Sequence, residues 1–343
     1  MADADVIVVG GGVIGTSTAR ALAGMGRKVL LLERFTIPHR RGSSHGASRI
    51  FRLSYEDPKF VRMAQEALPL WRELEEESGE DLLTVTGGLD LGKGLDEHAS
   101  ALESCGAAVR WLNDREIHDR FPSVSLPEGT RALFQPDAGY LAADRAVVAL
   151  AASARAHGAR IIEGAPVLGL REAGEGVEVA TAERTYRAPL AVVTAGGWAK
   201  GLLAGAGIDL PVRVTRETVA YFKVDEGAAI PSLVDWGSPA VYSLCSPGQG
   251  LKVGEHIAGP VTDPDDEGSP DPGSVERLRG WVEARYPLLD PEPHLAETCL
   301  YTVTDDEEFI IDRRGPIVIG SPCSGHGFKF APVTGRRLAE LAV

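Results

Sequence analysis

The hydrophobic pattern at the start of the chain predicts a strand, a tight turn, a helix and a second strand. An apolar-rich run at residues 5–9 ends in glycines, small and apolar residues at helical spacing continue to Gly26, and a second apolar run covers residues 29–32. The apolar period changes from that of a strand to that of a helix and back again. This order is typical of a βαβ unit that binds a dinucleotide, with the pyrophosphate at the helix N-terminus.

The glycines of the turn and the acid after the second strand predict separate contacts with such a ligand. Gly10 permits the sharp turn, Gly12 lets the backbone approach a pyrophosphate, and Gly15 lets the helix pack closely on the strand. Glu33 ends the second strand, where a carboxylate can accept both hydrogen bonds of a ribose diol. A bare GxGxxG also occurs in turns without a ligand, but here strand, helix and acid all fall where a dinucleotide needs them. The unit alone leaves NAD and FAD open.

Two more strands that end in glycine-rich loops favour FAD. Residues 142–157 predict an Ala-rich helix, and the buried strand at residues 191–194 ends on Ala195, Gly196 and a further glycine at a helix start. Near the C-terminus, a strand at residues 317–319 leads through SGHGFKF into another helix. The long isoalloxazine arm of FAD needs several separated loops, more than a minimal NAD domain provides.

The segments between these units break the βαβ rhythm and predict a second domain. Residues 58–78 form an amphipathic helix, residues 132–145 resemble a hairpin, and residues 211–302 contain alternating strands, an acidic Pro/Gly loop and one surface helix. We therefore expect an α/β fold with a Rossmann-like FAD domain and an α+β substrate domain on a mixed, largely antiparallel sheet. The expected FAD domain comprises residues 1–82, 143–210 and 303–343, and the substrate domain comprises residues 83–142 and 211–302.

Composition excludes several other classes of protein. The 343 residues allow two domains, 44% are hydrophobic, and the formal net charge of -14 comes without any Lys/Arg cluster that could bind nucleic acid. The acidic N-terminus leads directly into a core strand and no apolar run is long enough for a membrane, so we expect a cytoplasmic protein. The four cysteines show no CxxC spacing and no nearby His pairing, so neither a metal site nor a disulfide framework is indicated.

A loop rich in His, Arg, Ser and Gly at residues 37–58 is a candidate for ligand contact. Arg49 and Arg52 lie three residues apart, and on a helical turn both guanidinium groups would point to one side. Pairing with surface acids is the alternative. Because arginine binds carboxylates and phosphates bidentately, two of them beside a predicted anion site favour ligand binding.

Other candidate residues lie on two predicted strands and in the last glycine loop. In GLKVGEH, Lys252, Gly254 and His256 share one face, and the glycine leaves a gap that could seat a ring or a substrate. A solvated strand face explains the same pattern equally well. Cys299 shares a strand face with Tyr301, and by itself an isolated buried cysteine is usually a small hydrophobe. In SGHGFKF, Lys329 places a cation beside a helix N-terminus suited to anions.

Motifs along nearly the whole chain resemble those of the monomeric sarcosine oxidases and their N-methyltryptophan oxidase relatives. In order, these are VIVVGGGVIGT, PHRRGSSHGASRIFR, TAGGWA, GLKVGEH, ETCLYTVTDDEEFIID and SGHGFKF. The Cys-x-Tyr-Thr and SGHGFKF elements are far more specific than a glycine fingerprint. The resemblance implies FAD-dependent oxidation of a secondary amino acid, N-methyl or cyclic, to an imine that hydrolyses to an amine and an aldehyde, with O2 reduced to hydrogen peroxide.

The resemblance also implies roles for individual residues. Cys299 is expected to attach FAD covalently through a thioether to the flavin 8-methyl group. Arg52 and Lys329 are expected to hold the substrate carboxylate, and Lys252 to speed the reoxidation of the flavin by O2. Arg49 and His256 are the further expected catalytic residues, and Tyr55, Tyr242 and Tyr301 are expected to line the substrate site. The remaining expected cofactor contacts are Val13, Ile14, Arg34, His39, Ser44, Ser48, Val167, Ala195, Gly196, Trp198, Gly325, His326, Gly327 and Phe328, with Arg49 and Lys329 also in this set.

Two departures from the family pattern leave the closure of the FAD domain and the preferred substrate open. Chains of the family usually continue past the helix after GFKF, whereas this sequence ends at Val343. The segment PSLVDWGSPAVYSLCS is shorter than its counterpart and carries Trp236 in a region that shapes the pocket, so sarcosine need not be the preferred substrate. The alternatives are a flavin-dependent dehydrogenase that passes electrons to another acceptor and a flavin-binding protein without turnover. A small-molecule substrate and a monomer are expected in either enzymatic case.

Overall fold

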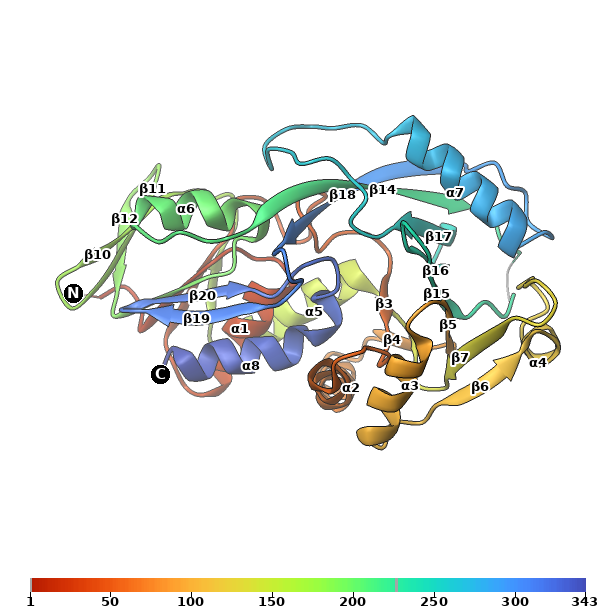
Figure 1. Ribbon diagram of the computed structural model, residues 1–343. Helices are drawn as coiled ribbons and strands as arrows, with labels where there is room; N and C mark the ends of the chain where they lie inside the picture. The colour runs from red at the N-terminus through yellow and green to blue at the C-terminus, as the bar shows by residue number, and fades with distance from the viewer. Residues whose placement is uncertain (1, 226–227) are drawn as a thin grey trace.

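The computed structural model describes residues 2–225 and 228–343, and within them the chain forms four β-sheets (Figure 1). The two larger sheets have six and eight strands, and each of the two smaller sheets has three. The α/β class expected from the sequence is confirmed. Across these two ranges, no helix combines the length and the apolar character that a membrane crossing requires.

The six-stranded sheet is built around β1, the first strand that the sequence predicts. Its order is β19-β20-β13-β1-β2-β9, with β1 parallel to both β2 and β13, and β13 parallel to β20. Strands that are covered on both faces have continuous apolar runs, as β1 and β2 do. The strands are β1 (Val6–Val9), β2 (Val29–Leu32), β9 (Arg160–Ile162), β13 (Leu190–Val193), β19 (Ile310–Arg314) and β20 (Ile317–Ser321).

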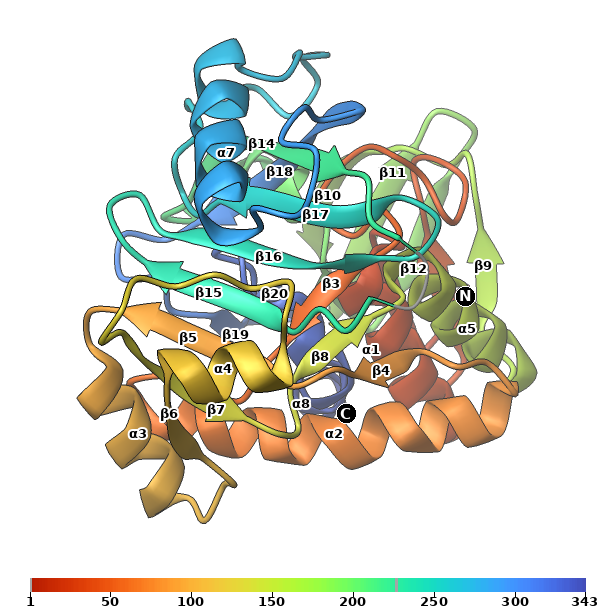
Figure 2. The ribbon, with the colours of Figure 1, turned by 90° about the vertical axis from the view of Figure 1, so that its right-hand side faces the viewer.

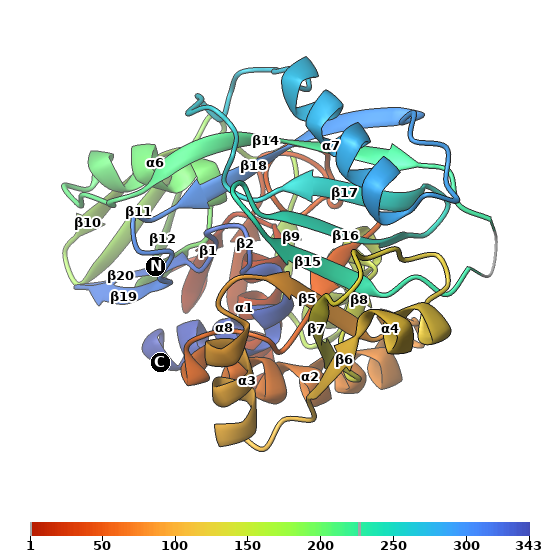
Figure 3. The same cartoon turned by 45° about the vertical axis from the view of Figure 1, so that its right-hand side comes forward.

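Different layers cover the two faces of this sheet (Figures 1 and 3). Val6 and Val8 of β1 pack with three helices, whereas Ile7 and Val9 pack with a three-stranded sheet and α6, because successive side chains of a strand point to opposite faces. The helices are α1 (Val13–Gly24), α5 (Ala143–Ala156) and α8 (Ala331–Leu341). The other layer consists of β10 (Val167–Ala173), β11 (Gly176–Thr181), β12 (Thr185–Ala188) and α6 (Ala199–Gly205).

The eight-stranded sheet has the order β18-β14-β17-β16-β15-β5-β7-β6 and is antiparallel except where β15 pairs with β5. Helix α7 (Pro272–Arg285) lies along one face of this sheet (Figure 2). Its residues Leu278 and Val282 share a core with Phe222 and Val253 of the sheet. The strands are β5 (Gly88–Gly92), β6 (Arg110–Asn113), β7 (Arg131–Gln135), β14 (Arg213–Phe222), β15 (Ser232–Trp236), β16 (Val241–Ser246), β17 (Gly250–Glu255) and β18 (Leu295–Val303).

Helix α2 (Pro58–Ser78) supports the C-terminal glycine loop. Asp57 caps its first turn by accepting a hydrogen bond from the Lys59 backbone nitrogen at 2.8 Å. On its buried face, Trp71 Nε1 donates to the carbonyl of Lys329 at 2.7 Å, which ties this long helix to the SGHGFKF loop. The remaining elements are β3 (Arg49–Phe51), β4 (Leu83–Val85), β8 (Gly139–Leu141), α3 (Leu95–Ser104), α4 (Asp114–Arg120) and the 3-10 turns η1 (Gly196–Trp198) and η2 (Phe328–Phe330).

The hairpin predicted at residues 132–145 is wrong. Its two halves are the strands β7 and β8, but β7 pairs with β5 and β6, whereas β8 pairs with β3 and β4 in another sheet. Alternation identifies a segment as a strand without identifying its neighbour, and the turn at Pro136 sends the chain into a different sheet. The division of the chain into two domains stays a prediction.

Candidate cofactor and substrate site

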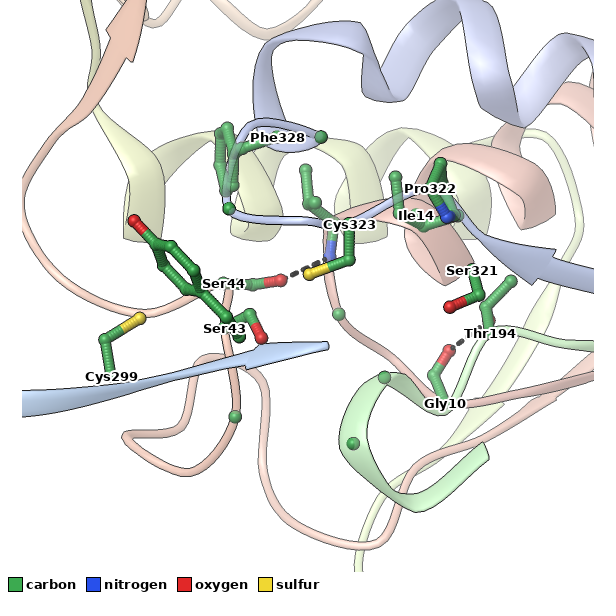
Figure 4. A pocket seen from close by; sticks show the side chains of 18 of the residues that line it. Gly10, Ile14, Ser43, Ser44, Thr194, Cys299, Ser321, Pro322, Cys323 and Phe328 are labelled. Carbon is green, nitrogen blue, oxygen red and sulfur yellow. Dashed lines mark hydrogen bonds between the residues drawn. The ribbon is translucent and has the colours of Figure 1, made fainter. Parts of the chain in front are cut away.

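A large cavity of about 690 Å³ lies between the two larger sheets. The carboxyl ends of β1, β2, β13 and β20 line one side, and β16, β17 and β18 line the other. Ligands of open α/β sheets bind at the carboxyl ends of the strands, and a cavity of this size accepts an extended ligand. Figure 4 shows Cys299 on one side of this cavity and Gly10 with Thr194 on the other.

The glycine turn has the close approaches that the sequence predicts. Gly10 has a φ of 102°, and a side chain added there would meet the Thr194 carbonyl at 2.7 Å. Gly15 lies outside the cavity lining, and a side chain added at Gly15 would overlap the carbonyl of Gly10. The backbone nitrogen of Val13 donates to Ser44 Oγ at 3.1 Å, which holds the Arg-rich loop against the start of α1.

The carboxylate of Glu33 is fixed at the end of β2. Its side chain is buried, Oε2 accepts from the Gly11 nitrogen at 2.5 Å, and Oε1 accepts from the Phe35 nitrogen at 2.8 Å. His39 Nε2 lies 3.6 Å from Oε1, and burial lowers the pKa of His39 although the charge of Glu33 opposes this. Each carboxylate oxygen has two lone pairs, so Glu33 can still accept hydrogen bonds from a ribose.

Cationic side chains gather at the other end of the cavity. Lys252 is 3% exposed and Lys329 is 1% exposed, and with Arg49 and Arg52 they line the same cavity. Lys329 Nζ donates to Tyr55 Oη at 2.8 Å and to the His326 carbonyl at 2.9 Å. Lys252 Nζ has the Ser48 carbonyl at 3.5 Å.

Arg52 occupies a stacked position within this cationic group. Its guanidinium donates to the Ser54 carbonyl and lies over two aromatic rings, 4.0 Å from the centroid of Tyr55 and 5.1 Å from that of Trp236. Within the described residues, neither Arg52 nor Lys329 has a carboxylate oxygen within 4.0 Å. Among the described residues, these two buried basic side chains at the end of the cavity therefore form no direct ion pair.

Burial shifts the pKa values of these groups toward their neutral forms. Burial, with the charge of Arg49 second, lowers the pKa of Lys252 to about 7. Burial, with the charge of Arg52 second, holds the pKa of Lys329 well below its usual range. An anionic ligand would reverse both effects, because it restores the interaction that favours the charged form. The chemistry of this end of the cavity therefore fits a carboxylate.

Arg49 and Arg52 do not lie on a helical turn, so that expectation is wrong. Arg49 begins β3, whose extended backbone sends side chains three residues apart to opposite sides. Arg49 consequently approaches Cys299, with Nη2 to Sγ at 3.7 Å, whereas Arg52 points toward Tyr55. Arg49 and Arg52 both still line the cavity, because this segment of the chain forms part of the cavity wall.

Cys299 and the neighbouring aromatic residues line the face of the cavity formed by the eight-stranded sheet. Cys299 is buried on β18 and lines the cavity, rather than packing into one of the large cores as an isolated cysteine usually does. The gap expected at Gly254 is filled, because a side chain added there would lie 2.7 Å from Tyr242 Oη. Burial raises the pKa of Tyr242 to about 12 and that of Tyr301 well above its usual value, so both phenols remain protonated.

His256 and His326, at the end of the cavity, both contact Glu307. His256 Nε2 lies 3.4 Å from a carboxylate oxygen of Glu307, and His326 Nε2 lies 3.2 Å from the carbonyl of Glu307. Glu307 has a φ of 58°, which is strained for a residue with a side chain. Burial holds the pKa of His326 well below its usual value, so Nε2 carries the proton that the carbonyl accepts and Nδ1 is an acceptor.

All other site residues expected from the sequence line the cavity, and the exceptions are Gly15 and Tyr55. Tyr55 lies behind Lys329 and supports it through the hydrogen bond to Oη. Asp265 was not expected from the sequence, and its carboxylate accepts a hydrogen bond from Trp198 Nε1 at 2.8 Å and pairs with Arg34. Asp265 belongs to an acidic loop, and no sequence pattern distinguishes it from the acids of that loop that do not line this cavity. Further missed lining residues are Phe35, Ser43, Thr194, Leu168, Ser321 and Cys323.

The residues present fit FAD. Among the described residues, the buried Ser48 Oγ, Ser321 Oγ and His326 Nδ1 have no hydrogen-bond partner, and all three residues line the cavity. Together with the glycine turn and Glu33, these atoms suit a long, polar ligand. No group of His, Cys, Asp or Glu in the described part of the chain could hold a metal ion.

The doubly covered sheet, the glycine turn and the long cavity define a flavin-dependent oxidoreductase. Residues 5–341 match the model of the FAD dependent oxidoreductase family, and the chain belongs to that family. It is 37% identical to the human peroxisomal sarcosine oxidase, over 99% of this chain and 92% of that protein. It is 34% identical to the monomeric sarcosine oxidase of Bacillus sp. (strain B-0618), with the same two coverages of 99% and 92%. It is 30% identical to the N-methyl-L-tryptophan oxidase of Yersinia pestis, over 99% of this chain and 95% of that protein.

Solved structures show the same fold. NikD, described as an unusual amino acid oxidase essential for nikkomycin biosynthesis, matches in its open form with a TM-score of 0.90 at 31% identity. That match covers 100% of this chain and 94% of NikD. An L-proline dehydrogenase from P. horikoshii matches with a TM-score of 0.89 at 23% identity, over 99% and 93% of the two chains, which shows the fold alone.

Proposed function

We propose that this protein is an FAD-dependent oxidase of secondary amino acids, N-methyl or cyclic, of the sarcosine type. The observation that carries the proposal is the pair of buried basic side chains at one end of the cavity, Arg52 and Lys329, which form no direct ion pair with the described residues. A buried charge without a partner is costly, and a substrate carboxylate supplies the missing partner. The similarity to sarcosine oxidases along nearly the whole chain supports the same substrate class.

Arg52 and Lys329 would bind the substrate carboxylate in different ways. Arg52 offers a planar fork that can bind both carboxylate oxygens, and Lys329 adds a point charge held in place by Tyr55 Oη. The ring of Tyr55 also stacks under the Arg52 guanidinium at 4.0 Å, which limits the motion of the fork. A carboxylate fixed in this way orients the carbon and nitrogen of the amine toward the centre of the cavity.

The opposite end of the cavity would hold the adenosine and pyrophosphate parts of FAD. Glu33 would accept hydrogen bonds from the ribose, and the nitrogens at the start of α1 would face the pyrophosphate. FAD, when bound, accepts the hydrogen and the two electrons that leave the substrate carbon next to nitrogen. Cys299 would attach to the flavin 8-methyl group through a thioether, which is the finer part of the cofactor proposal.

Lys252, Arg49 and His256 are the proposed catalytic residues around the flavin. With a pKa of about 7, Lys252 carries a positive charge on part of the molecules at neutral pH, and a cation there stabilises negative charge on oxygen as O2 is reduced to hydrogen peroxide. Arg49, next to Cys299, provides a second cation. The protonated phenols of Tyr242 and Tyr301 and the imidazole of His256 bound the space for the amine.

The test is reduction of the flavin under anaerobic conditions, followed by admission of air. We expect sarcosine or a cyclic secondary amino acid to bleach the yellow colour, and air to restore it quickly with formation of hydrogen peroxide. Slow recovery in air together with fast recovery on adding a quinone would instead indicate a dehydrogenase. Absence of bleaching by every secondary amino acid would indicate a flavin-binding protein without turnover.

The assembly and location of the protein are also proposals. Relatives named monomeric sarcosine oxidase support a monomer. A cytoplasmic location stays the expectation from the sequence, although the human and mouse relatives are named peroxisomal. The proposed FAD domain and substrate domain keep the boundaries given by the sequence.

A further inference from the structure

Trp236 stands directly beside the proposed carboxylate site. It is the last residue of β15, it lines the cavity, and the Arg52 guanidinium lies over its ring at 5.1 Å from the centroid. A carboxylate oxygen held by such a fork lies about 2.8 Å from a guanidinium nitrogen. The next carbon of the ligand, which carries the substituent of an amino acid, therefore comes within reach of the indole.

The indole is held in one orientation by polar and aromatic contacts. Trp236 Nε1 donates to Asp90 Oδ1 at 2.9 Å, and Asp90 is 1% exposed. The imidazole of His98 packs against the indole with 5.1 Å between the ring centroids. With Arg52 over the ring as well, swinging the indole aside would break a buried hydrogen bond to a carboxylate and two ring contacts. The indole is therefore a fixed wall, unlike an adaptable side chain such as methionine.

The same network joins this wall to the segment that carries Arg52. Gln135 donates through Nε2 to Asp90 Oδ2, and its Oε1 accepts from the backbone nitrogens of Leu53 at 2.9 Å and Ser54 at 2.8 Å. The Trp236 indole and the Arg52 guanidinium are thus held by one network of buried hydrogen bonds, and this network sets the distance between them.

We propose that Trp236, positioned by Asp90, is the residue that sets substrate specificity by excluding large substituents on the carbon next to the carboxylate. This inference rests on the proposed function and narrows it to secondary amino acids with a small substituent or none, such as N-methylglycine. Rejection by a rigid wall is a repulsive element, and it discriminates between substrates that share the same carboxylate and the same N-methyl amine.

The experiment compares kcat/KM for sarcosine and for N-methyl-L-phenylalanine, which differ only in that substituent. In the wild-type holoenzyme we expect sarcosine to be preferred at least about a hundredfold. Trp236→Ala should raise kcat/KM for N-methyl-L-phenylalanine at least tenfold and reduce the preference accordingly. A preference that changes less than twofold in Trp236→Ala, or a wild-type enzyme that uses both substrates equally, overturns the proposal.

A matched control is a second indole, which donates to the residue that precedes Trp236 on β15. Trp281 of α7 donates through Nε1 to Asp235 at 3.1 Å, but it lies outside the cavity lining. Trp281→Ala removes an equivalent indole–carboxylate bond, and it should leave the substrate preference unchanged. An equal loss of preference in both variants would show a general effect on packing, and it would also overturn the proposal.

The positioning role of Asp90 is tested separately. Asp90→Leu leaves the indole without an acceptor and should relax the preference, mainly through a lower KM for N-methyl-L-phenylalanine. Asp90→Asn keeps an acceptor oxygen and should restore most of the preference. If Asp90→Leu keeps the wild-type preference, Asp90 does not position the wall.

A binding assay separates failure of the inference from failure of the proposed function. Acetate and 3-phenylpropionate both carry a carboxylate, and the second adds a benzyl group on the next carbon. Their Kd values, followed by flavin absorbance, should show that Trp236→Ala improves 3-phenylpropionate binding at least tenfold relative to acetate binding. If no secondary amino acid is oxidised but this shift in binding occurs, the proposed function is wrong and the role of Trp236 in excluding large substituents is supported. If secondary amino acids are oxidised but this shift in binding does not occur, the role of Trp236 is wrong and the proposed function is supported.

Discussion

Replacing Lys252 by methionine should stabilise the protein while impairing one half of its reaction. Burial and the charge of Arg49 lower the pKa of Lys252 from 10.5 to about 7. At about 1.4 kcal/mol for each pKa unit, keeping this amine charged costs the folded state about 5 kcal/mol. Methionine has a similar length, no proton to lose and no desolvated charge.

The pH dependence of this gain has a defined sign. The folded state binds fewer protons than the unfolded state between pH 7 and 10.5, so the stability of the wild type rises with pH over that window. Lys252→Met should therefore gain up to about 5 kcal/mol in free energy of unfolding at pH 7 and below. The gain should shrink toward zero as the pH approaches 10.5.

Thermal unfolding at several pH values measures this difference. With about 0.7 kcal/mol/K of unfolding entropy for a chain of this size, the melting temperature of Lys252→Met should rise by about 7 °C at pH 7. Lys93→Met, at an exposed position, is the control and should change little. A melting temperature that is unchanged at pH 7, or a gain that grows with pH, would refute the reasoning. In rapid-mixing experiments, reoxidation by O2 should slow much more than reduction by substrate, and equal slowing of both would remove the assigned role.

The remaining predictions concern the cofactor link, the carboxylate site and the loop that holds His256. After acid precipitation, flavin should stay in the wild-type pellet and move to the supernatant in Cys299→Ala, whereas wild-type colour in the supernatant would leave Cys299 with a structural role. Lys329→Met should weaken acetate binding about 10- to 100-fold, because a charge-assisted hydrogen bond contributes about 1.5–3 kcal/mol, and unchanged binding in a flavin titration would contradict the site. Glu307→Gly should preserve or raise the melting temperature, since it relieves the φ of 58°, yet raise KM because His256 loses its partner. Normal kinetics in this variant would show that the carboxylate is dispensable.

The parts of the fold that local rules govern could be predicted from the sequence. The glycine turn, α1 and Glu33 follow from residue types at fixed spacing, and helix α2 follows from its apolar stripe. The partners of β7 and β8 could not be predicted, because strand pairing is set by contacts far apart along the chain.

The candidate site shows the same division. The position of Cys299 in the cavity wall could be expected only through resemblance to a family, since the residue pattern alone is that of a buried hydrophobe. The ring of Tyr242 fills the gap at Gly254 because β16 pairs with β17, and neither the pairing nor its register is visible in one strand. Asp90 lies in β5, remote in sequence from Trp236, and nothing local marks it as the acceptor of the indole hydrogen bond.

The cavity has one wall on each of the two larger sheets, and this has a mechanical consequence. The glycine turn that would hold the pyrophosphate follows β1 of the six-stranded sheet, whereas Cys299 lies on β18 of the eight-stranded sheet. A flavin bonded to Cys299 would therefore connect the part of the protein built on the six-stranded sheet to the part built on the eight-stranded sheet. These two parts are otherwise joined by packing and by the segments of chain that cross between them. With the covalent flavin, the two parts should unfold in a single thermal transition. Without it, the part built on the eight-stranded sheet should be able to unfold separately.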